Sequence, residues 1–160
     1  MKNRKFADGP VWFDGTNINE ALFCDEFLSH HKIIFANGAF FTPDGRVTDD
    51  IPLRGAIYEE LKCCAVNNIP RKITNILEVM KLAAHVEDFP PEADRIHLTN
   101  GTLKLDGTFT EGRPEIVRSR MPVAYRPEAP KPECWLSFLD GLLYSEDIPT
   151  LQEYLGYCLI

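Results

Sequence analysis

Apolar residues recur at intervals of three and four in five stretches of the chain, the spacing that puts side chains on one face of an α-helix. Residues that favour helix starts accompany several stretches: Asn17 with Glu20 resembles a capping pair, and Thr150 with Glu153 has capping-box spacing. Pro52 and Pro149 lie where a first helical turn tolerates them, and one helix is expected to begin after Pro70. The pattern predicts helices over 18–29, 51–66, 71–85 and 134–144, and a last helix with Asp147 and Thr150 at its start.

Each predicted helix has one apolar face that we expect to pack against a core. The positions concerned are Ala21, Leu22, Phe23, Phe27, Leu28, Leu53, Ile57, Leu61, Cys64, Ala65, Ile73, Ile76, Leu77, Met80, Ala83, Ala84, Trp135, Phe138, Leu139, Leu142, Leu151, Tyr154, Leu155 and Cys158.

Three stretches have the composition or alternation of β-strands. Asn37-Gly38 separates two β-rich runs, which predicts a hairpin with a type I′ turn because that turn needs positive φ at both central residues. From Ile96 onward apolar and polar residues alternate, with turns expected at Asn100-Gly101 and Asp106-Gly107. This predicts a three-stranded meander with Leu103, Leu105 and Phe109 on one face. Residues 116–125 predict one more extended segment.

The predicted elements define an α+β fold: a helical first half with one β-hairpin, a small antiparallel sheet, and two closing helices. An irregular N-terminal arm covers 1–16, with Trp12-Phe13 expected to anchor it. A helical lobe with the hairpin covers 17–88, and the hairpins with the C-terminal helix pair cover 95–160. The stretch EDFPPEAD is typical of a linker between these two regions.

Composition narrows the protein class. The 160 residues are 44% apolar and 26% charged, which is ordinary for a globular protein, and the formal net charge of -7 disfavours a domain that coats nucleic acid by bulk charge. The five cysteines show no CxxC spacing and are typical of reduced thiols. We find no signal-peptide pattern and no run of 18 apolar residues. A cytoplasmic domain without membrane contact is expected.

Basic residues between 113 and 131 form the first candidate nucleic-acid site. Arg113, Arg118, Arg120, Arg126 and Lys131 oppose Glu115 and Glu128, a net charge of +3. Alternate residues of a strand share a face, so Arg118 and Arg120 would follow a phosphate track. An edge strand whose charges protect it from aggregation explains the same pattern, and we favour it. Single-strand binders interleave aromatic residues for base stacking, and here only Tyr125 fits.

Arg71 and Lys72, at the start of the third predicted helix, form a second candidate. Two helices joined by a short link, with basic residues at this point, match a helix-turn-helix that meets a DNA backbone. An ordinary helical hairpin explains the same pattern, and we favour it.

Catalytic and metal-binding patterns are not evident. His30-His31, His85 and His97 lie in separate elements without partnered Cys or Asp spacing. No Ser or Cys has a nucleophile-elbow context, and no GxxxxGK[ST] phosphate loop occurs. We therefore expect a non-catalytic chain with no metal and no cofactor of its own.

The second half resembles the phage and plasmid primase family, in particular the domain that precedes the superfamily 3 helicase in poxvirus-type helicase-primases and their prophage relatives. Four motifs carry the resemblance over about residues 95–160, and a looser likeness extends upstream. They are Asn100-Gly101-Thr102-Leu103-Lys104-Leu105, Met121-Pro122-Val123-Ala124-Tyr125, Trp135 to Leu143, and Leu155-Gly156-Tyr157-Cys158-Leu159.

The resemblance implies a non-catalytic collar or adaptor that assists ring assembly, and possible contact with single-stranded or forked DNA. It implies that an ATP- and Mg-dependent helicase domain begins just after Ile160, so the parent would be a DNA helicase/primase and a homo-oligomer. The apolar end LGYCLI is also expected at such a boundary. The alternative is a self-association or protein-interaction module with no direct DNA contact.

Overall fold

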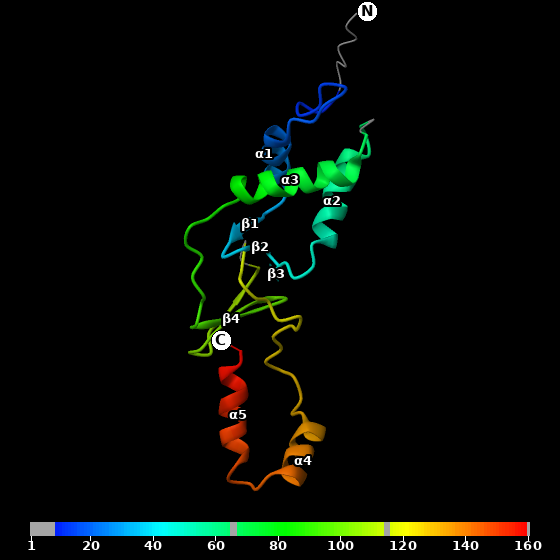
Figure 1. Ribbon diagram of the computed structural model, residues 1–160. Helices are drawn as coiled ribbons and strands as arrows, with labels where there is room; N and C mark the ends of the chain where they lie inside the picture. The colour runs from blue at the N-terminus through cyan, green and yellow to red at the C-terminus, as the bar shows by residue number, and fades with distance from the viewer. Residues whose placement is uncertain (1–8, 65–66, 114–115, 160) are drawn as a thin grey trace, which may run out of the picture. The chain divides into compact units, whose positions relative to one another are not determined.

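The computed structural model describes residues 9–64, 67–113 and 116–159 (Figure 1). The chain forms two compact units: unit 1 is Met1–Pro90 with Glu115–Arg118, and unit 2 is Pro91–Pro114 with Ser119–Ile160. Both units combine helices with a three-stranded antiparallel sheet, which confirms the predicted α+β class. The first half of the predicted arm, residues 1–8, and the predicted helix end at 65–66 lie outside the described residues. No helix among the described residues is long and apolar enough to cross a membrane.

Unit 1 contains α1 (Glu20–His30), α2 (Ile51–Leu61) and α3 (Ile69–Ala83), and α3 packs against both other helices. The predicted apolar faces of these helices are buried except at Ala21, Leu22 and Ala83, which are exposed. Trp12 is also buried, and its ring meets that of Phe23 edge-on, with the ring centres 4.9 Å apart. The arm is therefore anchored as predicted. The core residues are Trp12, Ile18, Phe23, Cys24, Phe27, Phe40, Leu53, Ile57, Leu61, Cys64, Ile73, Ile76, Leu77 and Met80.

The start of α1 differs from the prediction. Asn19, not Asn17, is the N-cap, and its Oδ1 accepts a hydrogen bond from the backbone N–H of Leu22 at 3.2 Å. Asp14 holds the backbone N–H groups of Thr16 and Asn17 in a turn, at 2.8 and 2.6 Å. The helix begins only after this turn because the Asp14 side chain competes for the same stretch of backbone.

The sheet of unit 1 confirms the hairpin at Asn37-Gly38. Strands β1 (Ile34–Ala36) and β2 (Ala39–Thr42) are joined by these two residues, whose φ angles are 50° and 76°. A short third strand, β3 (Gly45–Arg46), pairs with β2 after a turn through Pro43-Asp44.

The sheet of unit 2 consists of β4 (Arg95–Leu98), β5 (Gly101–Lys104) and β6 (Phe109–Glu111). The meander is present, but its first turn lies one residue earlier than predicted, because Leu98 pairs with Gly101 and the loop is Thr99-Asn100. Gly101 belongs to β5 and does not have positive φ. A Cβ there would lie 2.4 Å from the Phe109 ring, so this glycine permits close packing rather than a turn.

Leu105 is not part of the apolar face predicted for this meander. It lies beyond the end of β5 and is 61% exposed, whereas Leu103 pairs with both Ile96 and Phe109. The second turn does use Asp106-Gly107, with Gly107 at a φ of 86°. The alternating pattern thus runs one step past the strand, into the turn.

Residues 116–125 do not form a strand, contrary to the prediction. The backbone N–H of Arg46 bonds to the carbonyl of Arg118 at 3.1 Å in unit 1. In unit 2, Met121 N–H bonds to the carbonyl of His97 at 2.8 Å, and Thr99 N–H to that of Val123 at 2.9 Å. The first residues of the segment bond within unit 1 and the later ones within unit 2. The segment therefore does not run beside one strand long enough to form a regular ladder.

Unit 2 ends in α4 (Glu133–Leu142) and α5 (Ile148–Tyr157), which are present as predicted. Their predicted inward faces are wrong: α4 buries only Leu139, and α5 buries no described residue. The predicted capping box is also absent, because Thr150 lies inside α5 and Asp147 occupies the N-cap position without a side-chain hydrogen bond. Pro149 in the first turn fixes this earlier start.

Candidate functional site

The six candidate nucleic-acid residues are divided between the two units. Arg71, Lys72 and Arg118 belong to unit 1, and Arg113, Arg120 and Arg126 belong to unit 2. At the start of α3, Arg71 is exposed, while Lys72 Nζ lies 3.9 Å from a Glu20 carboxylate oxygen of α1. This ion pair links two helices of the core and gives Lys72 a structural partner.

Arg118 is held by unit 1 itself. Its guanidinium donates from Nε to the carbonyl of Phe89 at 2.6 Å and also donates from Nη2 to the same oxygen. The guanidinium carbon lies 5.9 Å from the centre of the Phe41 ring and 5.4 Å from that of Phe89. Hydrogen bonds from a charged donor and contacts with two aromatic rings are both stabilising, so Arg118 has a structural role in unit 1 between Phe41 and Phe89.

Arg120 has the same kind of role in unit 2. It is half-buried, and its Nη1 donates to the carbonyl of Leu98, at the end of β4, at 2.5 Å. Arg118 and Arg120 therefore do not alternate along a strand: Arg118 binds a backbone carbonyl within unit 1, and Arg120 binds one within unit 2. Arg113 and Arg126 are exposed.

Tyr125, the aromatic residue considered for base stacking, is also used in packing. Its ring lies 4.7 Å from that of Phe109, with an interplanar angle of 32°. Its backbone N–H donates to Asn100 Oδ1 at 2.8 Å, and Asn100 Nδ2 donates to the Tyr125 carbonyl at 2.9 Å. This paired bond fixes the MPVAY segment to the β4–β5 turn.

Most of the exposed large apolar residues described in unit 2 lie on and beside α4 and α5. Trp135 and Phe138 are 43% and 55% exposed and stack with their ring centres 5.7 Å apart. Tyr157 of α5 is 79% exposed. We define the α4–α5 apolar surface as Trp135, Leu136, Phe138, Leu142, Tyr144, Tyr154, Leu155, Tyr157 and Leu159. Apolar side chains concentrated in this way on exposed helices are typical of a protein-interaction site.

The charge of this region has a single sign. Residues 133–160 contain no Lys, Arg or His, and carry five carboxylates at Glu133, Asp140, Glu146, Asp147 and Glu153. All five are exposed. In helix geometry, Leu136 lies three residues after Glu133 and four before Asp140, so these two carboxylates border Leu136, whereas Trp135, Phe138 and Leu142 share the other side of α4.

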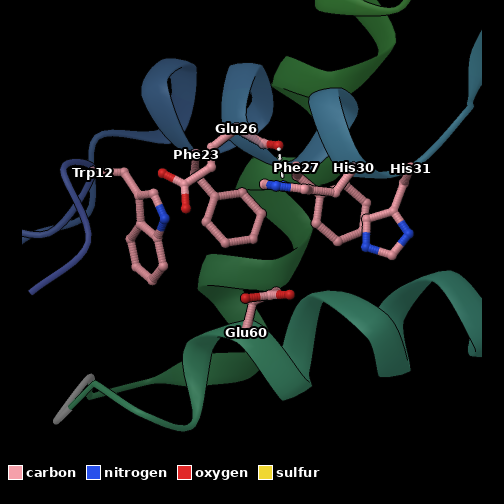
Figure 2. Close-up of a pocket in the computed structure, with 7 residues that line it drawn as sticks. All are labelled: Trp12, Phe23, Glu26, Phe27, His30, His31 and Glu60. Carbon is pink, nitrogen blue, oxygen red and sulfur yellow. Dashed lines mark hydrogen bonds between the residues drawn. The ribbon is translucent and has the colours of Figure 1, made fainter.

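A small pocket in unit 1 was not anticipated from the sequence. It has a volume of about 210 Å³ and is lined by Trp12, Phe23, Glu26, Phe27, His30, His31 and Glu60. Figure 2 shows the rings of Phe23 and Phe27 directed into the space from α1, with Glu60 directed toward them from α2.

The polar groups of this pocket do not form a catalytic arrangement. His30 Nδ1 lies 3.1 Å from the carbonyl oxygen of Glu26, one turn earlier in its own helix, and the His31 ring stacks on Phe27 at 4.1 Å (Figure 2). Among the described residues, no group of three or more His, Cys, Asp or Glu side chains is placed to hold a metal ion. His30 and His31 are adjacent in the sequence, and this spacing does not predict a pocket.

His97 is a buried polar residue in the sheet of unit 2, with 8% of its surface exposed. Its Nε2 lies 2.5 Å from Glu92 Oε2, and its Nδ1 lies 3.0 Å from Oγ1 of Thr102, its partner across the β4–β5 ladder. Both ring nitrogens therefore have partners, which accounts for the burial of this imidazole. The Glu92 contact could not be read from the sequence because Glu92 lies in the predicted linker.

The buried thiols are not activated. Burial raises the pKa of Cys24 to about 11, and its Sγ lies 3.6 Å from the carbonyl of Ile76. The pKa of Cys64 is also raised to about 11, chiefly by burial. A thiolate nucleophile requires the opposite shift.

Comparisons with known proteins do not assign the chain to a family. No protein-family model matches the chain, and no curated protein matches it.

Proposed function

We propose that this chain is a non-catalytic accessory domain, a collar or adaptor, of a phage-type DNA primase/helicase, and that it acts by protein–protein contact. Two observations support the proposal. The motifs of residues 95–160 resemble those that precede a superfamily 3 helicase, and the α4–α5 apolar surface is exposed. The exposed α4–α5 apolar surface is the reason why we propose contact with protein rather than with DNA.

The proposal has consequences for the parent protein. The helicase domain of the same parent would be the partner and would hold ATP and Mg, while this domain helps the ring to assemble as a homo-oligomer. Such a replication protein would work in the cytoplasm, where thiols stay reduced.

Sedimentation of the chain with a separately produced helicase domain of its parent tests this role. The wild-type chain should co-sediment with the helicase domain, and the double variant Trp135→Ser/Phe138→Ser should not. Leu105→Ser is the matched control, because Leu105 is an exposed apolar residue of the same unit outside the α4–α5 apolar surface. Equal association of all three proteins would contradict the proposal.

Direct contact with single-stranded or forked DNA is the second candidate function, supported by the exposed Arg71, Arg113 and Arg126. Removing one arginine that binds a phosphate should reduce the slope of log K against log salt by about one. The variant Arg113→Ala/Arg126→Ala of the full-length parent is more informative than changes at Arg118 and Arg120, because those two also hold the fold. Unchanged binding and unchanged salt dependence would exclude these two arginines as DNA-binding residues.

A further inference from the structure

Two asparagines of the sequence are followed by glycine, and the structure places the two pairs differently. Asn37 and Gly38 together form the loop between β1 and β2. Asn100 is the last residue of the loop between β4 and β5, and Gly101 already belongs to β5. This difference of one residue in register decides which of the two peptide bonds can turn.

An asparagine followed by glycine can lose ammonia without an enzyme. The backbone nitrogen of the glycine gives up its proton and attacks Cγ of the asparagine side chain. The side-chain nitrogen takes a proton and leaves as ammonia, so a cyclic succinimide forms. Water then opens the ring at either carbonyl and gives an aspartyl or an isoaspartyl residue. The attack requires the peptide between the two residues to turn until the glycine nitrogen faces Cγ, so hydrogen bonds that hold this peptide or the side-chain amide slow the reaction.

Asn100 is held at the atoms that the reaction would have to move. Its Nδ2 donates to the carbonyl of Tyr125 at 2.9 Å, and its Oδ1 accepts from the backbone N–H of the same residue at 2.8 Å. Its own carbonyl, which lies in the peptide that would turn, accepts from the backbone N–H of Gly112 at 3.1 Å. Gly101 is paired with β4 on one side and with β6 on the other. The reaction at Asn100 therefore requires unit 2 to open locally.

The peptide between Asn37 and Gly38 has no such restraint. Both residues are exposed. Within residues 9–64, 67–113 and 116–159, the Asn37 amide has no hydrogen-bond partner, and neither the Asn37 carbonyl nor the Gly38 N–H makes a backbone hydrogen bond. A Cβ at Gly38 would have nothing within 4 Å, so the space around it is open. Two-residue hairpin loops occur as type I′ and type II′ turns, which differ mainly in the orientation of this central peptide, so it can turn while β1 and β2 stay paired.

We propose that Asn37 is a site of spontaneous deamidation in the folded chain and that the structure protects Asn100 from the same reaction. The isoaspartyl product has one more carbon in the backbone of a loop that must reverse the chain between Ala36 and Ala39. Both alanines are buried and form the pair that closes the hairpin. The modification should therefore loosen β1 and β2, in a part of the chain far in sequence from the α4–α5 apolar surface.

Incubation of the whole chain at pH 8 and 37 °C, followed by a short trypsin digestion and mass spectrometry, tests the proposal. Cleavage after Lys32, Arg46, Arg95 and Lys104 gives the peptides 33–46 and 96–104, each of which contains a single Asn and no Gln. We expect deamidation in 33–46 to be at least tenfold faster than in 96–104. In guanidinium chloride that unfolds the chain, the two rates should become similar, because the hydrogen bonds of Asn100 are then lost.

Two variants separate the possible effects of the modification. Asn37→Asp carries the new charge with an ordinary backbone, and Asn37→Gly cannot deamidate but keeps a residue that tolerates positive φ. After incubation, amide hydrogen exchange in β1 and β2 should be faster in the modified wild-type chain than in either variant, because only the isoaspartyl product lengthens the loop. The exchange of Asn37→Gly should be the same before and after incubation.

The opposite results are equally clear. Similar rates for the two peptides in the folded chain would show that the register of the two loops does not control the reaction. An unchanged peptide 33–46, over a time in which the unfolded chain reacts completely, would show that the β1–β2 loop protects Asn37. Either result overturns the proposed site. Faster exchange in incubated Asn37→Gly would overturn the proposed loosening of the hairpin, because the cause would then lie elsewhere in the chain.

Discussion

Replacing Gly101 with Ala should destabilise the sheet of unit 2, because the added methyl group has no room. Its carbon would lie 2.4 Å from Cζ of Phe109 and 2.4 Å from the carbonyl oxygen of Thr110. A change of the Phe109 side chain at χ1 relieves the first contact, but the second involves the backbone of β6, which is paired with β5. The change is purely steric, since the backbone of Gly101 does not have positive φ.

The expected magnitude follows from these contacts. Overpacking a well-packed site costs about 1–3 kcal/mol. Because the carbonyl of Thr110 belongs to a paired strand and cannot move easily, we expect Gly101→Ala to cost about 3 kcal/mol. For a unit of this size, that loss lowers the melting temperature by roughly 12–24 °C. Amide hydrogen exchange in β4 and β5 should accelerate accordingly, which mass spectrometry of the exchanged chain measures alongside the thermal melt.

Two further variants make the test specific. Gly141→Ala, within α4, has nothing within 4 Å of the new Cβ and should stabilise by about 0.5–1 kcal/mol. Gly101→Ala/Phe109→Leu should recover part of the stability, because it removes the ring contact and keeps the carbonyl contact. If Gly101→Ala melts with the wild-type chain and its β4–β5 exchange is unchanged, the close packing of Phe109 on Gly101 is refuted.

Three other predictions concern unit 1. Arg118→Met should lower the free energy of unfolding by about 1.5–3 kcal/mol, measured by urea titration, because its charged hydrogen bonds are removed; Arg126→Met, at an exposed position, is the control and should change it little. The backbone N–H groups bound by Asp14 lower the pKa of its carboxyl below the ordinary 3.8, so this turn should be stabilised above that pH and lose the contribution as pH falls through the lowered pKa. NMR titration of the carboxyl resonance measures this, and a midpoint at or above 3.8 would contradict it. Alkylation at pH 8 followed by mass spectrometry should modify exposed Cys63, like exposed Cys134 and Cys158, before Cys24, which should react only on unfolding, since burial raises the pKa of Cys24 to about 11; equal rates for Cys63 and Cys24 would contradict this order.

Local backbone requirements made parts of the fold predictable. Asn37-Gly38 predicted its turn because few residues tolerate positive φ at two successive positions. The spacing of apolar residues predicted α2 and α3 together with their buried faces. Gly101 shows the limit of such arguments, since a glycine after Asn is equally explained by a turn and by an aromatic ring that lies above it.

The sites depended on long-range contacts that spacing does not encode. Arg118 is bound by the carbonyl of Phe89, 29 residues earlier, and an alternating basic pattern gives no indication of that partner. The helices α4 and α5 were predicted from periodicity, yet periodicity does not state whether an apolar face meets the chain's own core or another molecule. The exposure of Trp135 and Phe138 became evident only from the structure.

The return of residues 116–118 to unit 1 affects the order in which the protein can fold during synthesis. Val117 is 1% exposed, and Ile116 packs on the cluster formed by Ala36, Ala39 and Phe41. These residues are translated after the whole β4–β6 meander, whose strands pair over short sequence separations. All residues of the unit 2 sheet are therefore synthesised before residues 116–118, which complete the packing against the sheet of unit 1, even though unit 1 begins the chain.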